Sequence, residues 1–357
     1  MHFLTHCCPI LLAALLCVAV PSCATLPDAK PSSVKPSVIE YKPPELFYRE
    51  RRLSEEEQNA LPLVTQPPKL KAALEAIDSG SLEDRVARLK KKALEDLVFV
   101  KGGQFLMGDW GGYFGGADGF PAHLVNVTGF YISRYQVTYA EFDAYTDATK
   151  TPRTAEGSYA DRRSRHPLVP AGAAWQRARD YCQWVGQVTG LPFDLPTEAQ
   201  WEYAARSRGL FVLFPTDDGT IQHGRNVPGG KFHMERMRVV SEEDYHSSNL
   251  YPIGMFPPNP IGIYDLSHNG REWMLDWYDA EYYKHSPTDN PKGPETGEKK
   301  SVRSAVNNED LDFQGLTASR FAIESELMML WGDEWKQRPV FDKTLRCVVN
   351  TDKRLRK

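Results

Sequence analysis

Cysteine is the residue type in this chain whose number and spacing say most about its possible chemistry. A thiolate is soft and polarizable, so paired cysteines can bind copper and carry out redox reactions. The six cysteines are Cys7, Cys8, Cys17, Cys23, Cys182 and Cys347. None lies between Cys182 and Cys347, so the second half of the chain offers no close pair of thiols.

Cys23 follows a hydrophobic segment that predicts export. Residues 10–21 are apolar but too few to span a bilayer as a helix, which suits a signal peptide. The stretch Val20-Pro21-Ser22-Cys23-Ala24 resembles a bacterial lipobox, in which cleavage leaves the cysteine free for lipidation. We therefore expect residues 1–22 to be a lipoprotein signal peptide and Cys23 to carry the lipid.

An ordinary cleaved signal peptide is the alternative. Pro21 is unusual before the cysteine, and His2 and His6 stand where Lys or Arg is customary. Ala24 occupies the position where inner-membrane lipoproteins typically carry Asp. The expected location is therefore the periplasm, with the protein anchored to the outer membrane.

Export also affects the interpretation of Cys182 and Cys347, the two cysteines left in the mature domain. Two thiols in an oxidising compartment usually pair. Closing a loop of this length would stabilise the fold by on the order of 4–5 kcal/mol in the loop-entropy model. Two buried free thiols are the alternative.

Composition indicates a soluble globular protein. The chain has 357 residues, of which 41% are hydrophobic and 25% charged, enough for one large core or a core plus a small appendage. The formal net charge is −4, and Lys90-Lys91-Lys92 is the only basic run of its length. Nucleic acid is therefore not expected as the main partner.

The chain is expected to have five parts. The signal peptide is followed by a proline-rich tether at 23–45, a helical prelude at 46–97, the main domain at 98–350 and a basic tail at 351–357. Ser54 and Glu57 form a capping box, and Ser81 with Asp84 begins a helix whose apolar face holds Leu82, Val86, Leu89 and Leu94. The prelude could lie on the main domain or contact a partner.

The main domain is expected to mix short strands and helices. Residues 97–100 predict a buried strand, 105–107 a second strand, and 124–127 with 130–132 a strand pair. Thr138 and Glu141 predict the start of one helix, residues 173–188 a helix that ends at Gly190, and Thr197 with Gln200 a helix with Trp201, Ala204 and Ala205 on its inner side. After Arg206 the chain is rich in loops.

Several phrases occur in an order that carries a family resemblance. They are Phe99 to Gly108, Phe130 to Thr138 with Glu141-Phe142, Trp175 to Trp184, Leu195 to Ala205, Tyr264 to Trp273, Asn290 to Pro294 with Gly297, and Leu345-Arg346-Cys347. Together they resemble the formylglycine-generating enzyme, or sulfatase-modifying factor, family from about Val98 to Asn350. The resemblance implies an α+β domain related to C-type lectins and low in regular secondary structure. A Cys182–Cys347 disulfide also matches one in that family.

The resemblance breaks where the family carries out its chemistry. The family oxidises a substrate cysteine with two cysteines that follow a Gly-Gly-Ser phrase near the C-terminus. Here Arg303 is followed by Ser304-Ala305, and no thiol follows before Cys347. We therefore expect no copper and no formylglycine-type oxidation.

A second branch of the wider family holds non-haem iron through histidines. Beyond the signal peptide, no two histidines here have close ligand spacing, so no iron is expected, although a facial triad from distant segments stays open. His268 stands where the family usually has glycine, and we expect an exposed loop histidine.

The resemblance also implies structural calcium. Asn269 and Glu272 match positions that help hold calcium in the family, and oxygen ligands on a turn suit a hard cation. Asn226 and Val227 are candidates for a second site. Turn hydrogen bonding and capping are the alternative role for Asn269 and Glu272.

These features predict a binding protein. The candidate surface combines the loop 109–119, with Trp110, Tyr113 and Phe114, and the divergent stretch 301–335. Its candidate contacts in that stretch are Glu309, Asp310, Asp312, Phe313 and Trp335. Family members can be encoded beside secreted toxins or lipases, so an immunity-type inhibitor of such an effector is the leading hypothesis. An accessory structural lipoprotein of a secretion or surface assembly and a metal-dependent oxidoreductase with a non-standard site are the alternatives.

Overall fold

The computed structural model describes residues 54–61, 64–113, 117–154, 165–229, 250–306, 315–326, 328–331, 334–337 and 340–355. The chain divides into residues 1–45 and 46–357, and all described residues belong to the second unit. The signal peptide, Cys23 and the tether lie outside the described residues. Among the helices that are described, none has the length and apolar character needed to cross a bilayer.

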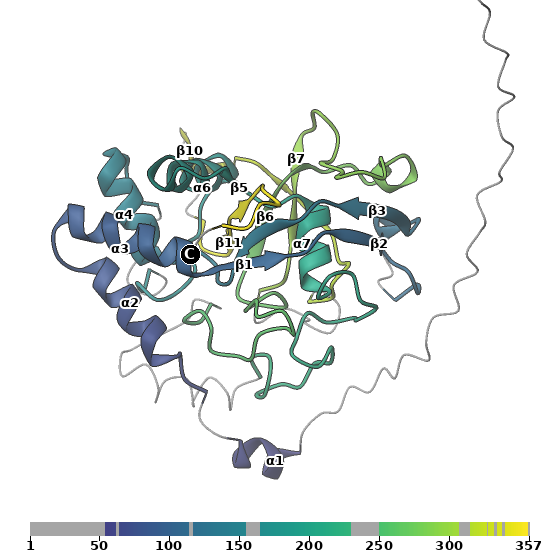
Figure 1. Cartoon of the computed structure of the whole chain (residues 1–357), viewed down its shortest axis with the longest axis horizontal. Helices are drawn as coiled ribbons and strands as arrows, with labels where there is room; N and C mark the ends of the chain where they lie inside the picture. Colours follow the sequence, from purple (N-terminus) through teal and green to yellow (C-terminus); the bar gives the residue numbers. More distant parts are fainter. Residues whose placement is uncertain are drawn as a thin grey trace, which may run out of the picture. The chain divides into compact units, whose positions relative to one another are not determined.

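Short helices and strands mix along the chain, which confirms the α+β class (Figure 1). The helices are α1 (Glu55–Ala60), α2 (Pro68–Asp78), α3 (Leu82–Glu95), α4 (Tyr139–Thr149), α6 (Trp175–Thr189) and α7 (Glu198–Ala205), with 3-10 turns η1 (Ala117–Gly119) and η2 (Tyr282–Lys284). The strands are β1 (Leu97–Val100), β2 (Gly103–Met107), β3 (His123–Val127), β4 (Phe130–Ser133), β5 (Phe193–Asp194), β6 (Arg271–Trp277), β7 (Lys299–Arg303), β8 (Phe321–Glu324), β9 (Met328–Trp331), β10 (Glu334–Gln337), β11 (Lys343–Thr344) and β12 (Val348–Val349).

The strands form two four-stranded sheets and two hairpins. The sheets have the orders β1-β4-β12-β5 and β11-β6-β7-β8, and the hairpins are β2-β3 and β9-β10. The predicted pairing of 124–127 with 130–132 is wrong: β3 pairs with β2, while β4 lies between β1 and β12. Strand β1 lies at the edge of its sheet and is only partly buried, contrary to prediction: Leu97 and Val100 are buried, but Phe99 is exposed.

Local sequence signals set the helix ends. Thr138 and Thr197 each accept a hydrogen bond from the third helical residue, whose side chain bonds back, so both predicted capping boxes are present. The Ser54–Glu57 box is present as well. Gly190 ends α6 with φ +76°, a left-handed conformation that glycine adopts at little cost.

The helical prelude packs on the main domain. Helices α2, α3 and α4 pack against one another (Figure 1), and Leu74, Ile77 and Leu89 have no exposed surface. Leu82 and Leu94, predicted to share the apolar face of α3, are exposed instead. The face that α3 buries thus differs from the one its leucines predict.

A charged residue takes part in that buried face. The Lys92 ammonium on α3 lies 2.9 Å from a Glu141 carboxylate oxygen on α4 and 2.8 Å from Asp96. Burial disfavours the charged lysine, but the two carboxylates outweigh it and raise the pKa of Lys92. This ion pair joins the prelude to the capping box of α4, because Glu141 also accepts from Thr138.

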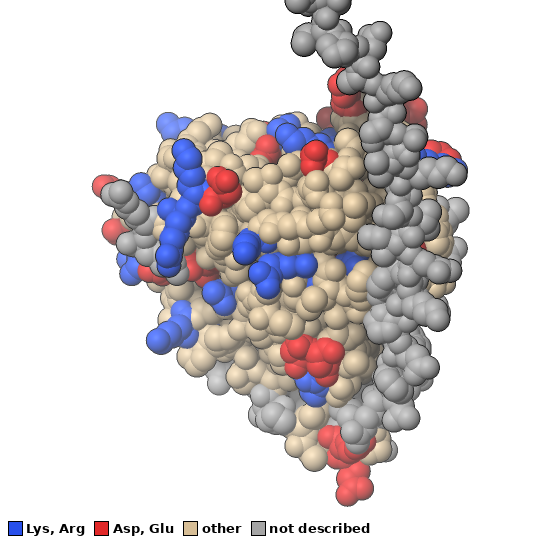
Figure 2. Space-filling model, turned by 45° about the vertical axis from the view of Figure 1, so that its right-hand side comes forward, with Lys and Arg blue, Asp and Glu red and all other residues tan. Residues whose placement is uncertain are grey.

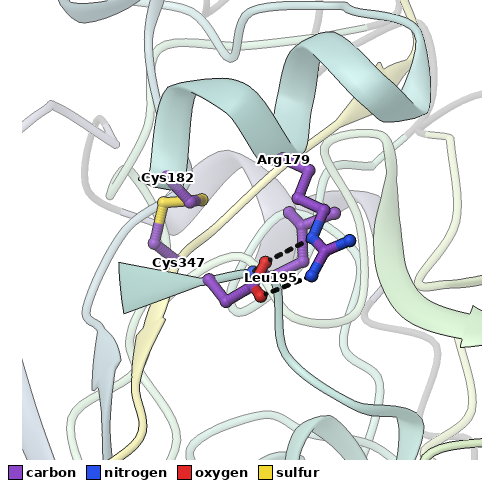
Figure 3. The surroundings of a disulfide bond; sticks show 5 residues. Arg179, Cys182, Leu195 and Cys347 are labelled. Carbon is purple, nitrogen blue, oxygen red and sulfur yellow. Dashed lines mark hydrogen bonds and ion pairs between the residues drawn. A yellow bond between two sulfur atoms is a disulfide. The ribbon is translucent and has the colours of Figure 1, made fainter. Parts of the chain in front are cut away.

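A disulfide between Cys182 and Cys347 spans 165 residues, as expected from the sequence. It joins α6 to the segment before β12, and both cysteines are buried (Figure 3). Beside it, Arg179 of α6 donates two hydrogen bonds of 3.0 Å to Asp194, the residue before Leu195. The disulfide thereby holds α6 against the C-terminal end of the main domain.

Replacing Lys92 tests the role of the prelude. Lys92→Ala leaves the buried Glu141 carboxylate without its cation, so we expect the free energy of unfolding to fall by about 3–5 kcal/mol. Lys91→Ala is the matched control, because Lys91 is exposed and should change stability by less than about 0.5 kcal/mol. Urea denaturation of both variants measures the difference. Equal effects would contradict a structural role for the prelude.

Removing the disulfide tests how much the Cys182–Cys347 bond stabilises the main domain. The Cys182→Ser/Cys347→Ser variant should lose about 5 kcal/mol of stability, since a long loop is released in the unfolded chain. Denaturant unfolding of oxidised wild type, reduced wild type and the variant gives this value. A variant as stable as oxidised wild type would show that the bond adds nothing.

Candidate functional site

Helix α7 presents two glutamates to strand β7. Glu198 and Glu202 are one helical turn apart, so both side chains lie on the same face. On β7, Ser301 and Arg303 alternate with Lys300 and Val302 and face this helix. Sequence reasoning placed only Trp201, Ala204 and Ala205 on the inner side, but α7 is buried almost all round.

Glu202 is bound by arginines from two directions. One carboxylate oxygen accepts from Arg303, and the other lies 3.0 Å from the Arg206 guanidinium and accepts from the Gly108 backbone N–H at 2.9 Å. Arg206, Glu202 and Arg303 have no exposed surface. The chain leaving β2 is thus attached to the end of β7.

Glu198 is bound in the same way by Arg320. Two guanidinium nitrogens of Arg320 lie 2.9 and 3.0 Å from the two oxygens of Glu198, and Arg303 lies 3.3 Å away. Arg320 also donates to the Asp118 carbonyl at 2.6 Å, which brings residues of the two candidate segments together. Burial opposes ionisation of Glu198, but Arg320 and Arg303 outweigh it and lower the pKa of Glu198.

Asp276 is the one carboxyl of this network that has no arginine. It accepts a hydrogen bond from the Glu198 backbone N–H, and burial together with the Glu198 charge raises the pKa of Asp276 to about 8. At neutral pH the group is therefore mostly protonated.

The opposite face of β7 carries an enclosed amine. The Lys300 ammonium lies 3.7 Å from the ring centres of both Trp175 and Trp277 and donates to the Leu275 carbonyl at 3.0 Å. Burial lowers the pKa of Lys300 to about 8. With almost no exposed surface, this amine serves packing rather than contact with a substrate.

Glu272, a predicted calcium ligand, forms a third buried ion pair, with Arg346. Its two oxygens accept from Arg346 at 2.7 Å each, and one also accepts from Trp201 at 2.9 Å. Asn269 exchanges hydrogen bonds with the Tyr251 backbone through both side-chain atoms. The structure therefore uses these two side chains for internal hydrogen bonds and charge pairing.

The second predicted calcium site is engaged in the same manner. The Asn226 oxygen accepts from the Gln222 backbone, its amide donates to Asp217, and the Val227 carbonyl accepts from Gly224. Within the described residues, no three His, Cys, Asp or Glu side chains gather as a metal site. Calcium binding stays a prediction that metal analysis can test.

His268 is buried, which corrects the expectation of an exposed loop residue. Its ring packs edge-on against Phe256, and its Nε2 lies 3.4 Å from the buried Asp265 carboxylate. Ser304 donates to the His268 carbonyl at 3.2 Å and has φ +71°, the left-handed conformation natural to glycine. The turn before β6 and the end of β7 are therefore in contact.

The residues predicted to contact a partner differ in their exposure and in whether the structure describes them. Trp110 is wrong as a surface contact, because its ring is buried beneath Tyr113 and Phe211 and near the Arg206 guanidinium. Tyr113 is half-buried. Trp335 lies on β10, but its side chain is not described. Phe114, Glu309, Asp310, Asp312 and Phe313 lie outside the described residues.

Sequence reasoning did not predict that Arg303 and Arg320 bind the buried glutamates of α7. Arg303 and Arg320 belong to the stretch that departs from the family pattern, and nothing in their neighbours' spacing identifies their glutamate partners. One available signal was the polar series Glu198, Glu202 and Arg206 at four-residue spacing. On a helix whose other residues are mostly apolar, this series indicates buried charge pairs.

Comparison with known proteins agrees with this architecture. Residues 83–347 match the model of the sulfatase-modifying factor enzyme 1-like domain. A formylglycine-generating enzyme from Streptomyces coelicolor is 31% identical over 253 residues, covering 58% of this chain and 76% of that protein. An inactive C-alpha-formylglycine-generating enzyme 2 from Bos taurus is 34% identical over 108 residues, covering 30% of this chain and 32% of that protein. The structure of PvdO from Pseudomonas aeruginosa superposes with TM-score 0.54 at 27% identity, covering 71% of this chain and 93% of that one.

The raised pKa of Asp276 predicts a pH dependence of stability. Folding favours the protonated carboxyl, so this contribution is complete below about pH 4 and is lost as pH rises towards 8. The side chain of Asp276→Asn is neutral at every pH and can still accept the hydrogen bond from the Glu198 backbone N–H. Its melting temperature relative to that of wild type should rise between about pH 4 and pH 8 and level off above pH 8.

Asp352→Asn is the control for that experiment, because Asp352 is exposed. Its melting curves should run parallel to those of wild type at every pH. Parallel curves for Asp276→Asn as well would show that this carboxyl ionises normally.

Proposed function

Because the chain belongs to the sulfatase-modifying factor enzyme 1-like domain family, we propose that it uses the family scaffold to bind another protein and does not oxidise cysteine. Folds with many loops on a rigid base suit recognition, and one fold can lose a reaction while keeping its surfaces. The relative named as inactive in Bos taurus shares part of this scaffold.

The observation that carries the proposal is the state of the cysteines. From residue 24 onward the chain has two, Cys182 and Cys347, and they are bonded to each other in a buried disulfide. No thiolate is left in this part of the chain to bind copper or to exchange with a substrate thiol. Copper therefore does not fit the donor set that the chain offers.

The charged groups next to the end of β7 support the same proposal. Glu198, Glu202 and Arg303 are bonded to one another or to neighbouring protein groups, and all are buried. General acid–base catalysis requires a group within hydrogen-bond reach of a substrate. This network acts instead as a brace beneath the surface loops.

The proposed setting is the bacterial envelope. A lipid on Cys23 and the tether 23–45 would hold the binding domain in the periplasm at the outer membrane. An immunity-type inhibitor of a secreted toxin or lipase needs tight binding and no turnover, which suits a domain without free thiols. An accessory lipoprotein of a secretion or surface assembly would use the same properties.

Metal analysis separates binding from catalysis. The purified protein should contain neither copper nor iron in stoichiometric amount and should not bind added copper(I) tightly, whereas calcium is compatible with the proposal. Reduced, unfolded protein is the positive control, because its released thiols should bind copper(I). Stoichiometric copper or iron in the oxidised, folded protein would contradict the proposal.

A further inference from the structure

Three apolar residues near the β2–β3 hairpin make an unusual surface. Leu124 on β3 is 46% exposed and lies directly opposite Leu106 on β2. Residues opposite each other in an antiparallel pair share a face, so both leucines point outward from the hairpin. Leu210, after α7, is 56% exposed.

Of these leucines, Leu106 joins an apolar cluster, while Leu124 lies opposite it on β3 and Leu210 precedes a second cluster member, Phe211, in the chain. Leu106 packs with Tyr113 and Phe211 against a buried group that includes Trp110. Below them, the Arg206 guanidinium donates to the Leu106 carbonyl at 2.6 Å and to the Leu210 carbonyl at 2.8 Å. One buried cation therefore fixes the backbone of both segments, and we call Leu106, Tyr113, Leu124, Leu210 and Phe211 the hairpin patch.

Two cations lie near the hairpin patch in the chain: Lys101 is two residues before β2, and Arg208 is two residues before Leu210. The Tyr203 hydroxyl donates to the Lys101 carbonyl at 3.2 Å, and the Tyr203 carbonyl accepts from the Arg208 N–H at 2.8 Å, so one residue connects both to the hairpin. Lys101 and Arg208 are exposed, and neither has an ion pair with any described residue. Figure 2, in which the right-hand side of Figure 1 comes forward, shows a face that is mostly uncharged, with Lys and Arg near its middle and patches of Asp and Glu above and below them.

We propose that the hairpin patch is the docking surface for a protein segment with apolar anchors flanked by carboxylates. This inference rests on the proposed binding function and names the surface and the chemistry of the partner. Apolar side chains held by a rigid base give the contact area of an interface core. Nearby cations without an ion pair to any described residue favour an acidic partner. Sequence reasoning chose the neighbouring loop but missed Leu124 and Leu210, which no local pattern marks as exposed.

Selection from a random peptide library displayed on phage tests the docking surface. The immobilised wild-type protein should enrich peptides with Leu, Phe or Trp next to Asp or Glu. Synthetic versions should bind Leu124→Glu, Leu210→Glu and Arg208→Glu about tenfold more weakly or worse, a loss typical of interface anchors. Leu82→Glu is the matched control, because Leu82 is 41% exposed on α3 and outside the patch.

Unchanged thermal melting of the four variants shows that each is folded. No enrichment, enrichment of basic peptides, or equal binding to the patch variants and to Leu82→Glu would overturn the docking surface. Self-association of wild type that Leu210→Glu abolishes would assign the patch to a second copy and contradict the proposal as well. None of these outcomes concerns metal content, so failure here is distinct from failure of the proposed function.

Discussion

Buried pairing of arginine with glutamate is the interaction on which the arrangement of this domain depends. Glu198 with Arg320, Glu202 with Arg303, and Glu272 with Arg346 are all shielded from water. Removing two charges from water costs several kcal/mol per ion, and the cost is offset only when both partners are in place with good geometry. In each pair the glutamate precedes its arginine by 74 to 122 residues. The C-terminal third must therefore be correctly placed before α7 and β6 are stable.

This dependence explains which features the sequence could predict. Capping boxes at Thr138 and Thr197 and the glycine that ends α6 depend on neighbours three or four residues away, so their residue types were sufficient. The disulfide was predictable because the main domain holds two cysteines, which allow one pairing. Ordered motifs identified the family and its α+β fold.

Other features depend on contacts distant in sequence. The partner of β3 is decided by packing around α7, and the burial of Lys92 by a carboxylate on α4. His268 looks like a loop residue in the sequence, yet Phe256 and the end of β7 enclose it. Trp110 was interpreted as a surface ring, but Arg206, which lies 96 residues later, holds the cluster that covers it. Propensity and periodicity carry no information about such partners.

The proposed loss of cysteine oxidation and the proposed binding role have one cause: the reactive side chains of the domain are bonded to one another. The disulfide engages both cysteines of the main domain, and the buried ion pairs engage the charged groups beside β7, so neither set of groups is free to react with a substrate. The most direct test is incubation of the metal-supplemented protein with dioxygen and a cysteine-containing peptide, followed by mass spectrometry. The account predicts a peptide whose thiol is not converted to an aldehyde. Catalytic conversion that is lost on substitution of a residue in 301–335 would contradict it.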